Sequence, residues 1–164
     1  MFSAGDKVVH PGYGPGIIRC IERRQILEDE KQYYIIDMMA GGGTLMTPVT
    51  KADEIGLRSA ISRAKAMALL QMLKEDPKPL PGDFKERHAG VQECLNEGDI
   101  FTSAGVVRDL AWHGHKRGLT KRDQQLKEKA EELVAGELAL VNGIQLKEAL
   151  EQVEAVLVAA MNGG

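Results

Sequence analysis

The sequence predicts an α+β protein in which a small β-barrel is followed by a compact all-helical domain. Between Lys7 and Val49, β-branched and aromatic residues stand in short runs bounded by glycine, proline or acidic residues, which is typical of strands and turns. After Gly56 the apolar residues recur every three or four positions, which is the period of a helix. With 164 residues, 43% of them hydrophobic, the chain can fill one moderate core or two small ones. We therefore expect a barrel domain over residues 1–57 and a helical domain over residues 58–164.

Four segments of the N-terminal part are predicted to be strands: "KVVH", "GIIRCIERRQI", "KQYYIIDMM" and "TLMTPV". The stretch "HPGYGPG" between the first two predicts tight turns, because Gly12, Gly14 and Gly16 can take positive φ. The stretches "LEDE" (27–30) and "AGGG" (40–43) predict two further turns. An open sheet of this size would be marginally stable, so we expect it to close on itself.

Five helices are expected in the second part. The first is "SAISRAKAMALLQMLKED", which must end before Pro77. The second is "DFKERHAGVQECLNEG", and the third is capped by Asp99 and ends at Gly118. Thr120 and Asp123 resemble a capping box for the fourth, and "IQLKEALEQVEAVLVAAM" is the fifth. The apolar positions expected on the buried face of the first helix are Ile61, Ala64, Met67, Ala68, Leu70 and Leu73.

The composition argues against several classes of protein. A formal net charge of −3 does not fit a basic protein that coats nucleic acid without specificity. Cys20 and Cys94 lie far apart without the spacing of zinc ligands, so both are expected to be reduced thiols in the core. The chain has no basic leader segment and no run of about 18 apolar residues. We expect a cytoplasmic protein without a membrane segment.

Motifs of enzyme families are absent from the sequence, which has no GxSxG turn, no P-loop and no dinucleotide-binding fingerprint. His113 and His115 are two positions apart, which on a helix directs them about 200° apart rather than toward one metal ion. His10, which precedes Pro11, is interpreted as a turn residue. We therefore expect no catalysis, no metal and no cofactor, which leaves binding as the expected mode of action.

The second predicted strand carries one candidate binding surface. Arg24 and Ile26 are two positions apart, so their side chains share a face of the strand. Such a strand could recruit a partner that adds to its sheet edge, with the arginine as an anchor. A solvated arginine beside a core isoleucine is the alternative interpretation.

The helical part carries a second candidate surface. Basic residues are concentrated in residues 108–122 of this part, and His113 and His115 would add to the positive charge when protonated. Such a patch can contact a few DNA phosphates without reading bases, although a solvated turn of mixed charge is equally consistent. Phe84 begins a predicted helix beside Lys85, and it either packs into the core or points outward as a wedge between base pairs. The basic residues of the stretch are Arg108, Lys116, Arg117, Lys121 and Arg122.

Several motifs together resemble the bacterial CarD/CdnL family. The N-terminal pattern F-x-x-GD-x-VVHP-x-YG-x-G-x-I-x-x-IE (2–22) is followed by "YYII" (33–36), "PV" (48–49) and "GLR" (56–58). The C-terminal half adds "VVRDL", "RGLT" and "EKAEELVAGELAL". The resemblance implies a Tudor-like barrel, a small SH3-like fold shared with the transcription-repair coupling factor. It further implies that the barrel docks on the β subunit of RNA polymerase and that the helical domain touches promoter DNA at the upstream edge of the bubble, stabilising the open complex.

The resemblance also assigns roles to individual positions. Arg24, Ile26 and Met46 fall where family members contact polymerase, although the third position often carries an arginine. Phe84 falls where the family usually places a tryptophan wedge for the minor groove, and Ala89 where some members carry a basic residue. An adaptor that binds polymerase without functional DNA contact is the alternative, and a monomer is expected, with strand swapping into a dimer left open. The residues expected to contact DNA are Phe84, Lys85, Arg87, Lys116, Arg117, Lys121 and Arg122.

Overall fold

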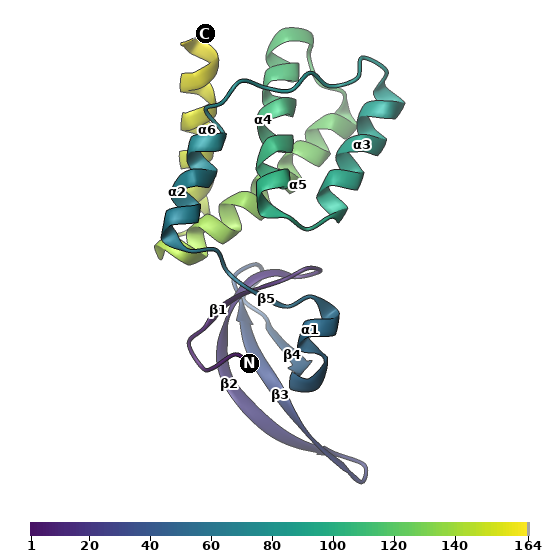
Figure 1. The fold of residues 1–164 in the computed structure, drawn as a ribbon, viewed down its shortest axis with the longest axis vertical. Coiled ribbons are helices and arrows are strands. Elements are labelled where there is room, and N and C mark those ends of the chain that lie inside the picture. Colours follow the sequence, from purple (N-terminus) through teal and green to yellow (C-terminus); the bar gives the residue numbers. More distant parts are fainter. Residues whose placement is uncertain (164) are drawn as a thin grey trace. The chain divides into compact units, whose positions relative to one another are not determined.

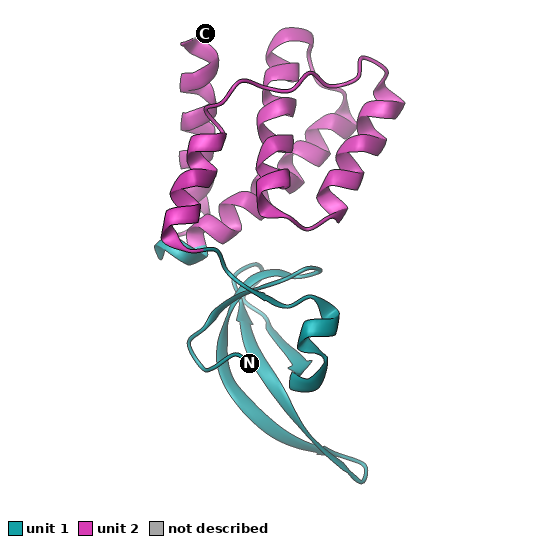
Figure 2. Cartoon of the chain, viewed as in Figure 1, with its two compact units in different colours: residues 1–61, 140–143 teal, residues 62–139, 144–164 magenta. Residues whose placement is uncertain are grey.

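The computed structural model describes residues 1–163. The chain divides into two compact units, one formed by residues 1–61 with 140–143 and the other by residues 62–139 with 144–164 (Figure 2). The first unit is built on a β-sheet and the second is helical, so the α+β class predicted from the sequence is confirmed. In the described residues, no helix combines the length and the apolar character that a membrane span requires.

The first unit contains five antiparallel strands in the order β4-β3-β2-β1-β5 (Figure 1). A short 3-10 turn, η1 (Val49–Lys51), and the one-turn helix α1 (Ala52–Ile55) connect the fourth strand to the fifth. All four predicted strand segments form strands. The strands are β1 (Lys7–His10), β2 (Gly14–Ile26), β3 (Asp29–Met38), β4 (Thr44–Pro48) and β5 (Arg58–Ser59).

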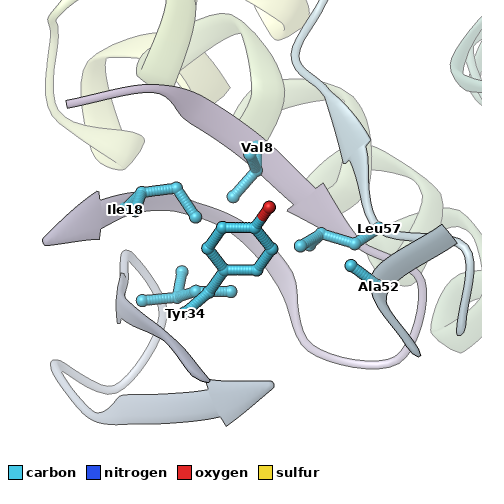
Figure 3. Packing of buried hydrophobic residues seen from close by; sticks show 6 residues of the cluster. Val8, Ile18, Tyr34, Ala52 and Leu57 are labelled. Carbon is cyan, nitrogen blue, oxygen red and sulfur yellow. The ribbon is translucent and has the colours of Figure 1, made fainter. Parts of the chain in front are cut away.

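The core of this unit surrounds Tyr34, whose ring packs among Val8, Ile18, Ala52 and Leu57 (Figure 3). The Tyr34 hydroxyl accepts a hydrogen bond from the backbone N–H of Phe2 at 3.0 Å. The Tudor-like fold predicted for this unit is confirmed, and its backbone pairing forms one ladder that runs from β4 to β5. Ala52 and Leu57, which follow β4 in sequence, complete the core in place of a closing strand pair.

The glycine-rich turn after β1 differs from its prediction in detail. His10 is the last residue of β1 rather than a residue of the turn itself, and it supports the turn, since its Nδ1 accepts hydrogen bonds from the backbone N–H groups of Gly12 and Tyr13 at 3.0 and 3.3 Å. Of the three glycines, Gly14 has positive φ (85°), whereas Gly12 and Gly16 do not. Gly16 is required for a different reason: a Cβ there would lie 2.8 Å from the carbonyl oxygen of Asp37 on the paired strand.

The second unit contains five helices, each in a segment that the sequence predicted. Ser62, Asp83 and Asp99 cap the first three by accepting hydrogen bonds from backbone N–H groups in the following turn. The third helix packs against the first, second and fifth. The helices are α2 (Arg63–Met72), α3 (Phe84–Asn96), α4 (Ile100–Arg117), α5 (Lys121–Asn142) and α6 (Leu146–Asn162).

The buried face of α2 is not the predicted one. Met67 is 73% exposed, and the alanines at 64 and 68 are exposed as well. Leu73 is buried as predicted, whereas the buried residues within the helix are Ala66 and Leu69, which the prediction did not include. Apolar residues occupy most faces of this helix, so the helical period does not by itself select the face that packs.

Gly16→Ala should destabilise the first unit by about 2 kcal/mol, because the added methyl group must displace the backbone of β3. Gly43→Ala is the matched control, since nothing lies within 4 Å of its added Cβ and its φ is not positive. It should change the free energy of unfolding by less than about 0.5 kcal/mol. Urea unfolding followed by circular dichroism measures both, and equal stabilities of the two variants would contradict the packing argument.

Candidate functional site

The residues expected to bind polymerase lie on one face of the sheet. Tyr34 points into the core, so Tyr33 and Ile35 on β3 lie on the opposite face of the sheet, which we call the outer face; Tyr33 is half-buried there and Ile35 is buried. Met46 pairs with Ile35, and Arg24 pairs with Lys31, four positions earlier on the same strand. Residues an even number of positions apart share a face, so Arg24 and Met46 both lie on the outer face.

The side chains of this face combine the exposed cations Arg24 and Lys31 with apolar groups. Arg24 is exposed and pairs with Glu22 at 3.1 Å, an ion pair at the surface that holds the guanidinium weakly. Ile26 is 52% exposed and Met46 is 38% exposed. Among the described residues, β1 pairs with β2 only as far as Ile17, and the backbone of Ile18 bonds to Gly5 and Asp6, so the edge of β2 beyond Ile18 is left without a neighbouring strand on that side.

Sequence reasoning missed three apolar members of the outer face, Cys20, Tyr33 and Ile35. The register between β2 and β3 shifts between Ile18 and Cys20, so Ile18 lies in the core while Cys20, two positions later, lies half-buried on the outer face. The expectation that Cys20 is a core thiol is therefore wrong. Cys20 lies an even number of positions before Arg24, so alternation counted back from Arg24 would have predicted its place on the outer face.

Arg87 was expected to contact DNA, but the structure buries it. Its guanidinium forms a fork with the carboxylate of Asp123, with Nε–Oδ1 and Nη2–Oδ2 distances of 2.9 and 2.8 Å. Its Nη1 donates to the carbonyl oxygens of Pro81 and Gly82. Arg87 is 4% exposed, so we remove it from the DNA-contacting set and assign it a bracing role between α3, the segment before it and α5.

Asp123 also completes the capping box predicted for α5. Its carboxylate accepts from the backbone N–H of Thr120 at 2.8 Å, while the Thr120 hydroxyl accepts from the N–H of Asp123 at 3.1 Å. His88 lies 3.0 Å from the same carboxylate. Burial alone would raise the pKa of Asp123, but the hydrogen bonds from Arg87 and Thr120 outweigh it and hold this pKa well below its usual range.

Phe84 is the first residue of α3 and is 52% exposed. Its N-terminal neighbour Asp83 caps the helix, and its ring lies 5.9 Å from the ring of His88, which contacts the Asp123 network. Lys85 beside it is exposed. The structure therefore presents an aromatic side chain and a lysine at a braced helix start.

The remaining cations flank this helix start. Lys116 and Arg117 are exposed at the end of α4, and Lys121 and Arg122 are exposed at the start of α5. The Arg117 guanidinium lies beside Gly82, at 3.7 Å from the position that a Cβ would take there. Figure 1 shows the start of α3 and the end of α4 at the same end of the helical unit. The described residues thus bring Phe84 and five cationic side chains to one end of the unit.

Two contributions to the expected basic patch are missing. Arg108 is 3% exposed and pairs with Asp109 and Glu75. Burial and the nearby charges of Arg87 and Arg117 lower the pKa of His113, which disfavours its charged form. Within the described residues, no three or more His, Cys, Asp or Glu side chains gather in a way that could hold a metal ion.

Comparison with known proteins matches both units. Residues 2–61 match the model of the CarD-like/TRCF RID domain, and residues 68–154 match the CarD C-terminal domain. YdeB of Bacillus subtilis (strain 168), named as a candidate transcription factor, is 30% identical over 150 residues, which cover 90% of this chain and 97% of YdeB. The solved structure CdnLNt of Myxococcus xanthus is 33% identical and covers 38% of this chain and 89% of its own, with a TM-score of 0.34.

A Tudor-like sheet unit joined to a CarD-type helical unit defines a class of bacterial transcription factor. The chain belongs to the CarD/CdnL family, as the sequence motifs predicted. This family consists of transcription factors rather than a known class of enzyme, and its N-terminal domain implies interaction with RNA polymerase.

Asp123→Asn should destabilise the helical unit by about 3 kcal/mol at pH 7, because it leaves the buried Arg87 without its counter-charge. The folded chain lowers the pKa of Asp123, so its stabilising effect is complete above about pH 5 and is lost as the pH falls below the unfolded value of about 4. Urea unfolding at pH 7 and pH 3 should therefore show that the difference in free energy of unfolding between parent and variant is smaller at pH 3. A gap of equal size at both pH values would contradict the assignment.

Proposed function

We propose that the protein binds the β subunit of RNA polymerase through its outer face and contacts promoter DNA through the Phe84 end of its helical unit. The observation that carries this proposal is the common face shared by Arg24, Ile26 and Met46, directed away from the core within the RID-type domain. Partly exposed apolar side chains around an arginine are typical of interface anchors. The free edge of β2 beside them suits a partner strand.

The DNA contact rests on the exposed aromatic ring at the start of α3. A phenylalanine can enter the minor groove between base pairs as an apolar wedge, with cations beside it to contact phosphates. We propose that Phe84 is this wedge at the upstream edge of the transcription bubble. The residues proposed to contact phosphates are Lys85, Lys116, Arg117, Lys121 and Arg122, all of them exposed.

The proposed mechanism is a population shift without chemistry. A factor that binds the open promoter complex more tightly than the closed one favours the open complex, and each 1.4 kcal/mol of differential binding is about a tenfold change in that equilibrium. We assign polymerase binding to residues 1–57 and the DNA contact to residues 58–164, in a monomer that acts in the cytoplasm.

A protein-interaction adaptor is the second candidate, favoured by one hollow in the helical unit. This hollow has a volume of about 210 Å³ at the end of α4, and its lining combines Pro77, Pro79, Leu80 and Trp112 with charged residues that include Asp109, Lys116 and Arg117. The apolar part of this lining suits a protein side chain better than a phosphate. The adaptor would bind polymerase normally and leave the lifetime of the open complex independent of Phe84.

Arg24→Glu should weaken binding to purified polymerase β subunit by at least about 30-fold, because it reverses the charge of an interface anchor. Arg23→Glu is the matched control, since it makes the same charge change on the adjacent, exposed residue of the opposite face. Titration with fluorescently labelled protein measures both affinities. Equal affinities of the two variants would show that the outer face is not the docking surface.

Phe84→Ala should shorten the lifetime of the open promoter complex about tenfold while leaving the affinity for polymerase unchanged. Phe84→Trp should keep the lifetime of the open complex at the parent value or lengthen it, since the indole ring offers a larger stacking surface than the phenyl ring. Dissociation of preformed complexes after addition of competitor DNA measures this lifetime. An unchanged lifetime in the alanine variant would favour the adaptor.

A further inference from the structure

The β2–β3 hairpin extends beyond the rest of its sheet. The neighbouring strand β1 pairs with it only as far as Ile17, and β4 only as far as Tyr33. Residues 23–32, which we call the hairpin arm, therefore pair with each other alone in the described structure (Figure 1). Every residue of the arm is exposed, and its two apolar residues are Ile26 and Leu27. The arm thus contributes no side chain to the core.

The turn at the tip of the arm carries an unfavourable residue. Ile26 pairs with Asp29, so Leu27 and Glu28 form a two-residue turn. Leu27 has a φ of 59°. Among the described residues other than glycine, it alone has positive φ, so Glu28 does not share that conformation. Positive φ at the first turn position alone is the pattern of a type II′ turn, in which that position is ordinarily glycine.

The leucine gains nothing within its own chain for this conformation. Its side chain is 94% exposed, so it neither packs nor fills a hollow in the first unit. A leucine in the left-handed region is strained relative to glycine, and such strain is often retained where a residue serves function. A contact that compensates for this strain is thus not made by the Leu27 side chain within its own unit, which leaves the side chain available to a partner.

We propose that Leu27 is an apolar anchor that the RNA polymerase β subunit buries when it docks on the outer face. This inference rests on the proposed function, and it extends the docking surface from the sheet to the tip of the arm. The occupant follows from continuity, because Leu27 directly follows Ile26, which lies on the outer face beside Arg24. Two adjacent exposed apolar side chains on an arm with no core are suited to an apolar hollow in that partner.

The anchor predicts opposite effects of one substitution on stability and on binding. The strain of Leu27 is present in the free and the bound chain, whereas burial of its side chain occurs in the bound state alone. Leu27→Gly removes the strain and the side chain together. It should raise the midpoint of thermal unfolding by about 3 °C. The gain is small because glycine is freer than leucine in the unfolded chain and therefore loses more entropy on folding. It should also weaken the affinity for polymerase β subunit about tenfold.

The experiment measures thermal unfolding and polymerase β affinity for the full-length chain and three variants. Leu27→Met keeps both the apolar side chain and the strain, so it should match the parent in both measurements. Arg24→Glu tests the docking surface itself. The proposal is supported when Leu27→Gly melts higher and binds about tenfold more weakly while Leu27→Met does neither.

Each remaining outcome overturns a stated part. Normal binding by Leu27→Gly, with weak binding by Arg24→Glu, would sink the anchor and keep the proposed function. Normal binding by both would instead remove the outer face as the docking surface and the anchor with it. A midpoint that fails to rise in Leu27→Gly would show that Leu27 is not strained, and would overturn the reasoning from the turn.

Discussion

The buried pair of Arg87 and Asp123 is the contact on which the arrangement of the helical unit's exposed end depends. One guanidinium binds the start of α5 through the carboxylate and the segment before α3 through two carbonyl oxygens, so three stretches of chain are fixed at one point. A buried charge is tolerated when its partner and its hydrogen bonds are all present. The pair thereby joins α3, which begins at Phe84, to the start of α5, where Lys121 and Arg122 lie. Arg87, which was expected to contact DNA, instead braces residues that remain exposed.

In the sheet unit the corresponding constraint is the register shift between Ile18 and Cys20. Without the extra residue, strict alternation from the core residue Ile18 would direct Arg24 and Ile26 to the core side of the sheet. The shift instead directs them to the outer face. Met46 lies on the same face, because it pairs with Ile35 of β3. A single irregularity in pairing therefore separates the residues that stabilise the fold from those available to a partner.

Both units follow the same physical plan, in which a fixed frame holds a few exposed apolar and cationic side chains. Ile26, Met46 and Phe84 are large apolar residues left open to solvent, which is unfavourable for an isolated chain and useful for one that acts through contacts. A frame that is already ordered loses little further entropy on binding. This plan suits a family of transcription factors, whose effect requires that one state of a complex be bound more tightly than another.

The sequence by itself determined the positions of four strands and five helices, the caps at Asp99 and Thr120–Asp123, and the family resemblance, but not the short elements α1 and β5. These features depend on residues within a few positions of one another, where turn chemistry and apolar period act. The buried face of α2, the burial of Arg87 and the outer-face position of Cys20 were decided by the tertiary structure alone. Arg87 meets a partner 36 positions away, and the face of a strand depends on its register with another strand. Such long-range contacts leave no local signal, because a surface arginine and a braced arginine have the same neighbours in sequence.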